Sequence, residues 1–214
     1  MITAQQASLK TLELCRMAPV IPVLVIEDVA VARPLAEALV AGGLPVLEVT
    51  LRTRAALEVI AEMAKVPGAV VGAGTVLTKA DVEAAKAAGA QFAVSPGATD
   101  LLCAACEEAG LPLLPGAATA TEAMKLLERG YTTVKFFPAE TSGGAPALKA
   151  LGGPLPQITF CPTGGIGPNN AADYLALPNT HCVGGSWVAP ADKIKAGDWE
   201  GITALAKAAA QLGR

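Results

Sequence analysis

The chain alternates between short, continuously apolar segments and longer segments in which apolar residues recur at helical spacing. Each short segment is bounded by glycine or proline, and successive ones begin 20 to 25 residues apart. The eight segments are residues 20–25, 45–50, 69–75, 91–96, 112–116, 132–138, 157–162 and 181–186. Continuous apolar runs are typical of parallel strands covered on both faces. The pattern therefore predicts eight parallel strands.

The segments between these strands predict helices, several with a recognisable start or stop. Residues 31–40 are followed by Gly42 and Gly43, and glycine commonly ends a helix. Thr78 is a candidate N-cap for a helix that ends at Gly89. Further helices are predicted at residues 100–109, 119–129 and 192–212, with a short one after residue 141 and an extra one at residues 4–17.

Eight strand–helix repeats without a break in composition predict an α/β protein, a single-domain (β/α)8 TIM barrel with an extra N-terminal helix. Residues 1–214 then form one domain, with the N-terminal helix at 1–17, the barrel core at 18–190 and a C-terminal helix at 191–214. The alternative is a doubly wound open sheet, which usually has a glycine-rich phosphate turn after its first strand. Glu27 and Asp28 follow the first strand instead, and the sequence contains neither GxGxxG nor GxxxxGK[ST].

Composition narrows the class of protein. Of the 214 residues, 52% are hydrophobic and 16% charged, and the formal net charge is −3. Disorder requires low hydrophobicity and high net charge, so we expect a folded protein. Because the net charge is slightly negative, we expect no surface that binds nucleic acid or acidic membranes. The longest apolar run, residues 18–26, is too short to span a bilayer, and the polar residues 1–10 contain no signal core. We therefore expect a soluble, cytoplasmic protein.

Histidine and cysteine limit the metal and redox chemistry. Because His181 is the only histidine in the sequence, His-rich zinc sites and HExxH metalloproteases are excluded. Five cysteines without a secretory signal are expected to be reduced thiols. Cys103 and Cys106 have CxxC spacing but lie in a helix-like segment without a neighbouring cation, so we interpret them as small buried hydrophobes.

Apart from His181, only two side chains that are charged at neutral pH interrupt the eight strands: Glu48 in the second and Lys135 in the sixth. A charge in a strand buried on both faces is costly unless it is paired, neutralised or open to a cavity. Both residues lie toward the carboxyl ends of their segments, where barrel enzymes carry their active sites. The alternative is an internal salt bridge that only holds the barrel together.

The surroundings of Lys135 favour nucleophilic chemistry. Val134, Phe136 and Phe137 flank it, and loss of hydration favours the neutral amine over the ammonium. A neutral amine can attack a ketone and form a Schiff base. Glu48, the only strand carboxylate, can then move protons on and off the adjoining carbon.

Polar and glycine-rich turns follow several strands at the same end of the predicted barrel. Gly164-Gly165 and Gly185-Ser186 end the seventh and eighth strands, where many barrels hold a phosphate with backbone N–H groups. Arg52 follows the second strand and is a candidate clamp for a carboxylate. Thr75 and Thr163 offer hydroxyl groups on this rim, although a helix-cap or turn role explains their spacing equally well.

Six sequence blocks together resemble the 2-keto-3-deoxy-6-phosphogluconate (KDPG) aldolase and 4-hydroxy-2-oxoglutarate (KHG) aldolase family. The most specific are Lys-Phe-Phe-Pro-Ala-Glu at 135–140 and Pro-Thr-Gly-Gly-Ile at 162–166. The others are residues 47–53, 71–77, 93–97 and 183–187, and the resemblance runs in order from about residue 20 to residue 190. Residues 115–121 and the N-terminal helix match less closely.

The resemblance implies a class I aldolase on a (β/α)8 barrel, usually a homotrimer, that acts without a metal ion or cofactor. Such enzymes cleave a phosphorylated 2-keto acid, 2-dehydro-3-deoxy-6-phosphogluconate, to pyruvate and D-glyceraldehyde 3-phosphate in the Entner–Doudoroff pathway of carbohydrate metabolism. Relatives often also cleave 4-hydroxy-2-oxoglutarate to pyruvate and glyoxylate. Which 2-keto acid is the physiological substrate stays open, the galactonate-derived epimer included.

The resemblance also implies roles for individual residues, all of the expected type. Lys135 would form the Schiff base and Glu48 would be the proton shuttle, directly or through a water. The remaining assignments are Arg52 and Thr75 for the pyruvate carboxylate, Thr163 for stereoselectivity, Pro96 for the pocket lining, and Gly164, Gly165, Gly185 and Ser186 for the phosphate. Two alternatives use the same glycine turns: another phosphate-binding barrel enzyme, such as an isomerase or a thiamine-phosphate-type synthase, and a barrel that binds a phosphosugar without chemistry.

Overall fold

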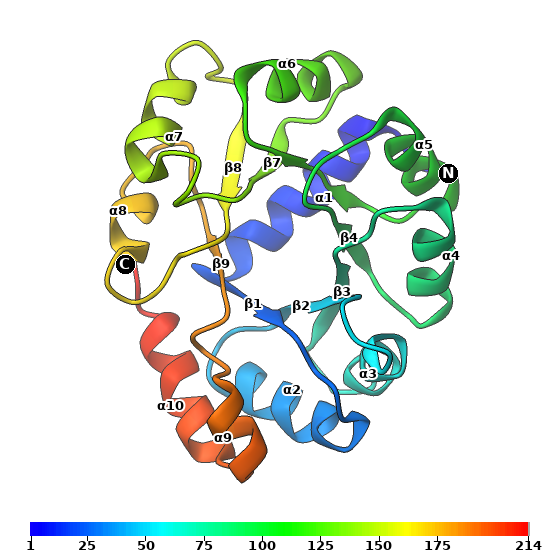
Figure 1. Cartoon of the computed structure of the whole chain (residues 1–214), viewed down its shortest axis with the longest axis vertical. Coiled ribbons are helices and arrows are strands. Elements are labelled where there is room, and N and C mark those ends of the chain that lie inside the picture. Colours follow the sequence, from blue (N-terminus) through cyan, green and yellow to red (C-terminus); the bar gives the residue numbers. More distant parts are fainter. Residues whose placement is uncertain (214) are drawn as a thin grey trace.

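A computed structural model describes residues 1–213 as a ring of parallel strands surrounded by helices (Figure 1). The chain begins with α1 (Ala4–Met17) and then alternates between strands and helices. The strands are β1 (Val20–Leu24), β2 (Val46–Thr50), β3 (Val70–Gly74), β4 (Phe92–Val94), β5 (Leu113–Leu114), β6 (Gly116–Ala117), β7 (Thr133–Phe136), β8 (Thr159–Pro162) and β9 (Val183–Gly185). Each lies inside a predicted apolar segment or extends it by one residue, so the strand prediction is confirmed.

All strand pairs are parallel, in the orders β5-β4-β3-β2-β1-β9 and β6-β7-β8. The fifth predicted strand is divided into β5 and β6 by Pro115, which has no N–H to donate to a ladder. The Pro115 carbonyl still accepts the Lys135 N–H at 2.8 Å, so the ring continues through this point. Between β8 and β9 it is closed by two isolated bridges, Phe160 with Thr180 and Thr163 with Gly184. The predicted α/β barrel is confirmed.

The helices outside the ring are the 3-10 turn η1 (Val29–Val31), α2 (Ala32–Ala41), α3 (Ala56–Met63), α4 (Lys79–Ala87), α5 (Asp100–Ala109), α6 (Ala120–Arg129), α7 (Gly144–Gly152), α8 (Ala171–Leu175), α9 (Ala191–Ala196) and α10 (Trp199–Ala209). The predicted cap is present, because the Thr78 hydroxyl accepts the Asp81 N–H at 3.2 Å. Gly130 ends α6 in the left-handed conformation, which glycine adopts without a steric penalty. The strand–helix alternation predicts helices at the places of α3 and α8, but the sequence analysis gave them no bounds.

The prediction of one C-terminal helix at 191–214 is wrong. Gly197 ends α9 at φ +67°, and Asp198 begins α10 by accepting the Gly201 N–H at 2.9 Å. A left-handed glycine followed by an N-cap aspartate stops one helix and starts another, whatever the apolar spacing across the break. Arg214, the last residue of the predicted helix, lies outside the described residues.

Helix α1 covers the amino ends of the strands. The Ser8 hydroxyl accepts the backbone N–H groups of Thr132 and Thr133, at the start of β7, at 2.7 and 2.9 Å. Farther along α1, Cys15 packs inside the barrel against Cys161 and Cys182. The extra N-terminal helix, predicted as an addition to the barrel, thus closes one of its ends.

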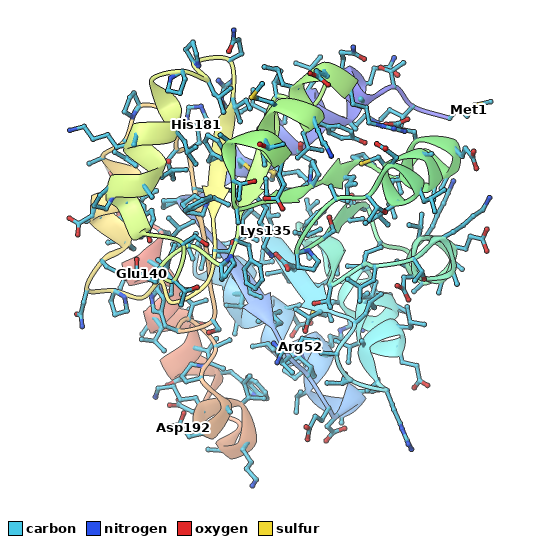
Figure 2. The ribbon with its side chains drawn as sticks, turned by 45° about the horizontal axis from the view of Figure 1, so that its top comes forward. Met1, Arg52, Lys135, Glu140, His181 and Asp192 are labelled. Atoms are coloured by element: carbon cyan, nitrogen blue, oxygen red, sulfur yellow. The ribbon has the colours of Figure 1, made fainter. Side chains whose placement is uncertain are left out.

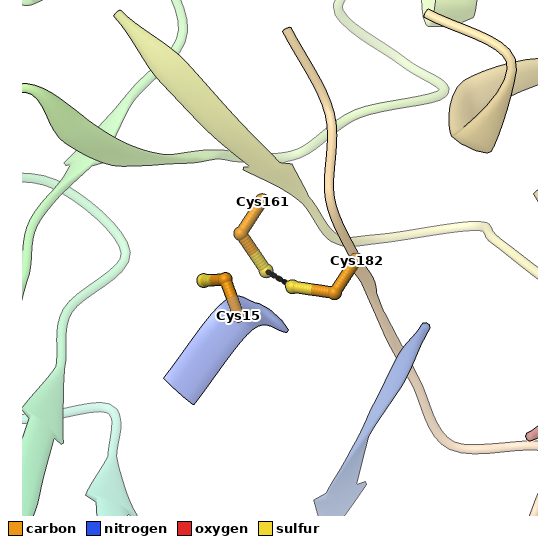
Figure 3. Close-up of side chains that lie close together, drawn as sticks. All are labelled: Cys15, Cys161 and Cys182. Carbon is orange, nitrogen blue, oxygen red and sulfur yellow. Dashed lines mark hydrogen bonds between the residues drawn. The ribbon is translucent and has the colours of Figure 1, made fainter. Parts of the chain in front are cut away.

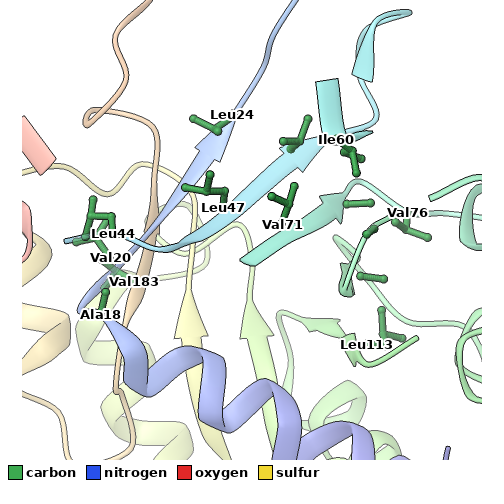
Figure 4. Close-up of a cluster of buried hydrophobic side chains, with 14 of the residues drawn as sticks. Ala18, Val20, Leu24, Leu44, Leu47, Ile60, Val71, Val76, Leu113 and Val183 are labelled. Atoms are coloured by element: carbon green, nitrogen blue, oxygen red, sulfur yellow. The ribbon is translucent and has the colours of Figure 1, made fainter. Parts of the chain in front are cut away.

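The apolar core has two layers. The larger lies between the strands and the outer helices and includes Leu24, Leu47, Ile60 and Val71 (Figure 4). The smaller fills the barrel interior and consists of Cys15, Ile21, Val46, Phe92, Val94, Leu114, Cys161 and Cys182. Within residues 1–213, no helix has the length and apolar character that crossing a bilayer requires.

Candidate active site

Glu48 and Lys135, the two charged residues in the predicted strands, meet inside the barrel. Their Cα atoms belong to β2 and β7, which are not neighbours, yet the Lys135 Nζ lies 3.1 Å from Glu48 Oε1 and 3.4 Å from Oε2. Their side chains are only 7% and 4% exposed. Figure 2 shows Lys135 near the middle of the molecule, with His181 well away from it. The predicted proximity of the two groups is confirmed.

Two glycines of β3 make room for neighbouring side chains, Gly74 for Glu48 and Gly72 for Phe92. A Cβ atom on Gly74 would lie 2.3 Å from Glu48 Oε1, and one on Gly72 would lie 2.4 Å from the Phe92 ring. Both distances are shorter than any normal contact, so a larger side chain at either position would displace Glu48 or Phe92. The sequence analysis missed these glycines, although a glycine within a strand is a signal for close approach; in the β2–β3 register Gly72 pairs with Glu48 and Gly74 with Thr50.

The buried pair has a specific chemical capacity. Lys135 Nζ lies 5.4 Å from the centre of the Phe137 ring, close enough for a cation–π interaction with the ammonium form. Glu48 accepts the hydrogen bonds of that ammonium, and so it is placed to take a proton from it. Proton transfer within the pair would leave a neutral, nucleophilic amine beside a carboxylic acid.

Thr75 directly follows β3 and has φ +58°, the only positive φ of a residue other than glycine among residues 1–213. A β-branched residue in this region is strained, and such strain is concentrated at functional sites. The Thr78 side chain, not that of Thr75, caps α4. The strain favours the site role of Thr75 over the alternative role as a helix cap.

Arg52 lies in the loop after β2 and is exposed to solvent. Its loop is attached to the preceding one, because the Thr53 hydroxyl donates to the Ile26 carbonyl at 2.6 Å. Among the described residues, no carboxylate forms an ion pair with Arg52. Its guanidinium is therefore available to a ligand on this side of the barrel.

Thr163 directly follows β8 and is 6% exposed, and its Oγ1 has no hydrogen-bond partner in the described part of the chain. Gly184 lies directly against it, since a Cβ there would be 2.3 Å from Thr163 Oγ1. A buried hydroxyl without a partner is costly and marks a position where a ligand can supply the missing bond. No helix begins at Thr163, so the helix-cap interpretation does not apply.

The two glycine turns lie next to each other, because the bridge between Thr163 and Gly184 joins the ends of β8 and β9. Gly164 and Gly165 have φ +104° and +76°, which an L side chain rarely adopts. Within residues 1–213, the N–H groups of Gly164, Gly165 and Ser186 have no backbone acceptor. Unpaired N–H groups on adjacent turns form an anion-binding concavity.

The remaining predicted residues, Gly185 and Pro96, also adjoin this part of the barrel. Gly185 pairs with Pro22 of β1, and Pro96 lies against Gly116, where a Cβ would be 2.3 Å from the Pro96 backbone. Gly116 is the register partner of Lys135, so Pro96 belongs to the wall beside the lysine.

The cysteines form two groups with different properties. Burial raises the pKa of Cys103 to about 11 and that of Cys106 to about 12, so both thiols stay protonated, in keeping with a packing role. Inside the barrel, hydrogen bonds with Cys15 and Cys182 lower the pKa of Cys161, and the nearby Lys135 ammonium acts in the same direction. The sequence analysis did not bring Cys15, Cys161 and Cys182 together, because they are far apart in the chain.

Comparison with known proteins places this geometry in a family. A family model described as KDPG and KHG aldolase matches residues 12–205. A 2-dehydro-3-deoxy-phosphogluconate aldolase of Pseudoalteromonas atlantica is 57% identical over 192 residues, which are 89% of each chain. The chain belongs to the KDPG and KHG aldolase family. The resemblance noted from the sequence blocks is thereby confirmed, and this aldolase is an enzyme of the lyase class.

Solved structures agree with the fold of this aldolase. The KDPG aldolase of Zymomonas mobilis ZM4, solved with 3-phosphoglycerate, has a TM-score of 0.90 at 55% identity and covers 94% of each chain. The KDPG aldolase of Legionella pneumophila was solved with pyruvate captured as a covalent carbinolamine intermediate. It has a TM-score of 0.90 at 48% identity and covers 92% of this chain and 97% of its own.

Proposed function

We propose that this aldolase cleaves 2-dehydro-3-deoxy-6-phosphogluconate to pyruvate and D-glyceraldehyde 3-phosphate through a Schiff base on Lys135. The observation that carries the proposal is the buried contact of 3.1 Å between Lys135 Nζ and Glu48 Oε1, in a member of an aldolase family. A nucleophilic amine and a carboxylate that can move its protons are the two groups that the reaction requires. The covalent carbinolamine of the Legionella relative supports the same chemistry here.

The first half of the reaction forms the electron sink. Glu48 takes a proton from the Lys135 ammonium, and the neutral amine attacks the C2 ketone to form a carbinolamine. Glu48 returns its proton to the leaving hydroxyl, and loss of water gives a protonated imine, which withdraws electrons from C3 far better than a ketone does. Because this cation supplies the electron sink, the step requires no metal ion and no organic cofactor.

The second half breaks the carbon–carbon bond. Glu48, directly or through a water, removes the proton of the C4 hydroxyl, and the C3–C4 bond breaks with its electrons passing into the imine. Glyceraldehyde 3-phosphate leaves, and Glu48 returns a proton to C3 of the enamine. Hydrolysis of the resulting imine then releases pyruvate and restores the Lys135 amine.

The rim residues hold the two ends of the substrate. Arg52 and the strained Thr75 are assigned to the carboxylate beside C2, with Pro96 as part of the wall. The Thr163 hydroxyl, buried without a partner, is assigned to the reacting centre, where it influences stereoselectivity. The phosphate is assigned to the adjacent turns that contain Gly164, Gly165, Gly185 and Ser186, whose local N–H groups compensate for the overall charge of −3.

A second substrate, 4-hydroxy-2-oxoglutarate, is part of the proposal, because the matching family model names both activities. This acid carries a carboxylate where the main substrate carries its phosphate-bearing chain, so the glycine turns would contribute less to its binding. We also assign the enzyme to the cytoplasm and to a homotrimer without nucleic-acid or membrane partners. Five free cysteines, all buried, support a reducing compartment.

Borohydride reduction in the presence of pyruvate tests the Schiff base. Trapping followed by peptide mapping is expected to place one pyruvate-derived adduct on Lys135, and Lys135→Arg should form none, because a guanidinium is not nucleophilic. Glu48→Gln should keep the adduct while slowing turnover and pyruvate proton exchange by about 10²- to 10⁴-fold. An adduct on another lysine would refute the assignment, and the complete absence of trapping would favour an isomerase or a binding barrel.

Substrate choice is tested by comparing cleavage rates on three acids. We expect kcat/KM to be highest for the gluconate-derived acid, lower for its galactonate-derived epimer and lowest for 4-hydroxy-2-oxoglutarate. Thr163→Ala should reduce the ratio between the two epimers more than the rate on the non-phosphorylated acid. An epimer ratio unaffected by this change would remove the proposed stereochemical role of Thr163.

A further inference from the structure

Three of the five cysteines gather at one point in the barrel interior (Figure 3). Cys15 comes from the last turn of α1, Cys161 from β8 and Cys182 from the residue before β9. Their three Sγ atoms lie within 4.8 Å of one another, and the Cys182 thiol donates to Cys161 Sγ at 3.5 Å. All three are free thiols and at most 2% exposed. The aldolase reaction proposed above uses none of these three thiols.

The geometry suits a small central atom. Three points within 4.8 Å of one another always have a common centre no farther than about 2.8 Å from each. Bonds from thiolate sulfur to a metal are about 2.3 Å long, so a bound ion would require each sulfur to move inward by about half an ångström. Small rotations of cysteine side chains provide such a movement.

The surroundings decide which kind of ion fits. The trio packs against apolar side chains such as Ile21, Val46 and Phe92, and no other cysteine, histidine or carboxylate of residues 1–213 joins the group. Zinc requires a fourth ligand, which these residues do not provide. Copper(I) with three thiolates would leave two negative charges in an apolar interior, and burying charge is costly. A trivalent ion bound by three thiolates is neutral and needs no fourth ligand.

We propose that Cys15, Cys161 and Cys182 form a tridentate binding site for a trivalent thiophile, with arsenous acid as the ligand. Each thiol replaces one hydroxyl group, so As(OH)₃ and three S–H groups give As(S-Cys)₃ and three molecules of water. Three S–H and three As–O bonds break, three As–S and three O–H bonds form, and no oxidant or reductant is needed. The site is separate from Lys135 and Glu48 in its ligands and in its chemistry.

Access to the site is through movement of α1. This helix covers the amino ends of the strands and is attached to β7 by the Ser8 hydroxyl, which accepts two backbone N–H groups. Arsenous acid is small and uncharged at neutral pH, so it can enter an apolar interior when the helix opens. Uptake should therefore be slow in the native protein and fast during refolding.

Occupation of the site is expected to affect the active site above it. Cys161 is the register partner of Lys135 in the β7–β8 pair, and Thr163 follows two residues later in the same strand direction. Drawing Cys161 toward Cys15 displaces β8 relative to β7. This effect on the active site rests on the proposed function, and it is detected as a loss of aldolase activity in parallel with arsenic uptake. Arsenic uptake itself is measured by mass and does not depend on an assay of aldolase activity.

The experiment uses the whole reduced protein with arsenite, both in its native state and during refolding from denaturant. After removal of free arsenite, intact mass is expected to show one arsenic atom added and three hydrogens lost. Alkylation under denaturing conditions should then modify two of the five cysteines, with the other three protected. A native circular dichroism spectrum confirms that the adduct belongs to folded protein.

Matched variants locate the adduct. Cys15→Ala removes one ligand and should weaken retention of arsenic by about 100-fold or more, because a third linked ligand acts at high effective concentration. The double variant Cys103→Ala/Cys106→Ala removes two other buried thiols and should bind arsenic as the unchanged protein does. The proposal is overturned if neither loading condition gives an adduct protecting three cysteines, or if Cys15→Ala retains it undiminished.

Discussion

Two regions of the barrel differ in whether they contribute to reactivity or to the stability of the fold. The charged centre, which consists of Glu48, Lys135 and Gly74, contains a buried ion pair, and the glycine leaves the space that the Glu48 carboxylate occupies. The α1 cover, which consists of helix α1 with its Ser8 contacts, instead satisfies the backbone groups of β7 and packs apolar surface. Buried charges carry a desolvation penalty, whereas satisfied backbone groups and apolar contacts stabilise the fold. The first region is therefore expected to serve reactivity and the second stability.

The largest expected effect concerns the ion pair itself. Lys135→Met leaves Glu48 buried without a partner and should lower the free energy of unfolding by about 3–5 kcal/mol. The double variant Lys135→Met/Glu48→Leu removes both charges and should be as stable as the unchanged protein, or more stable by about 1–4 kcal/mol. Both should lack aldolase activity. Urea unfolding at neutral pH measures the two values.

The double variant is the critical measurement for the comparison. If it were as unstable as Lys135→Met, the pair would be a net stabiliser of the barrel, and the charged centre would have the same role as the α1 cover. Retained activity in either variant would show that the pair is purely structural.

A smaller effect is expected for the space beside Glu48. In Gly74→Ala, the new methyl group would lie 2.3 Å from Glu48 Oε1, so the carboxylate must move away from Lys135. Overpacking of this kind costs about 1–3 kcal/mol, and a displaced proton shuttle should reduce kcat by about 10²-fold. Gly97→Ala is the control, because a Cβ at Gly97 meets nothing within 4 Å. Equal kinetics for the two variants would show that the glycine is not required for the carboxylate position.

The smallest effect is expected for the α1 cover. Ser8→Ala leaves the N–H groups of Thr132 and Thr133 without their acceptor and should lower the free energy of unfolding by about 1–3 kcal/mol. Activity at 25 °C should be unchanged, because the variant protein is still folded and the catalytic pair is untouched. Ser142→Ala, whose hydroxyl makes no hydrogen bond within the described residues, is the matched control for thermal unfolding. A loss of kcat without a loss of stability would contradict the division between the two regions.

Prediction from the sequence succeeded where local patterns carry the information. Continuous apolar runs and their regular spacing identify the strands, and Thr78 and Gly130 mark helix ends through local hydrogen bonding and backbone conformation. It was wrong for the C-terminal helix, because the apolar spacing continues across Gly197 although the backbone does not. It gave no bounds for α3 and α8, because no cap or glycine stop was recognised there.

For the active site, the sequence identified candidate residues by their chemical type, but it did not identify the residues that they contact. Glu48 and Lys135 are conspicuous because a charge is unusual in a strand covered on both faces. Nothing local indicates that Gly74 makes room for the carboxylate, that the Thr163 hydroxyl is buried without a partner, or that Cys15 approaches Cys161 from a helix. These relations depend on the closure of the ring.

The order of apolar runs, glycines and caps along the chain was sufficient to determine the strand–helix alternation, because this alternation follows from short-range periodicity. The sequence also marked two charges as unusual, because burying a charge in a strand is costly. Only the tertiary structure decided that these charges lie 3.1 Å apart, that α1 closes one end of the barrel and that three distant thiols share one point. The physical reason is that closing a ring brings together residues that are up to 167 positions apart, and their distances depend on the register and curvature of every strand between them.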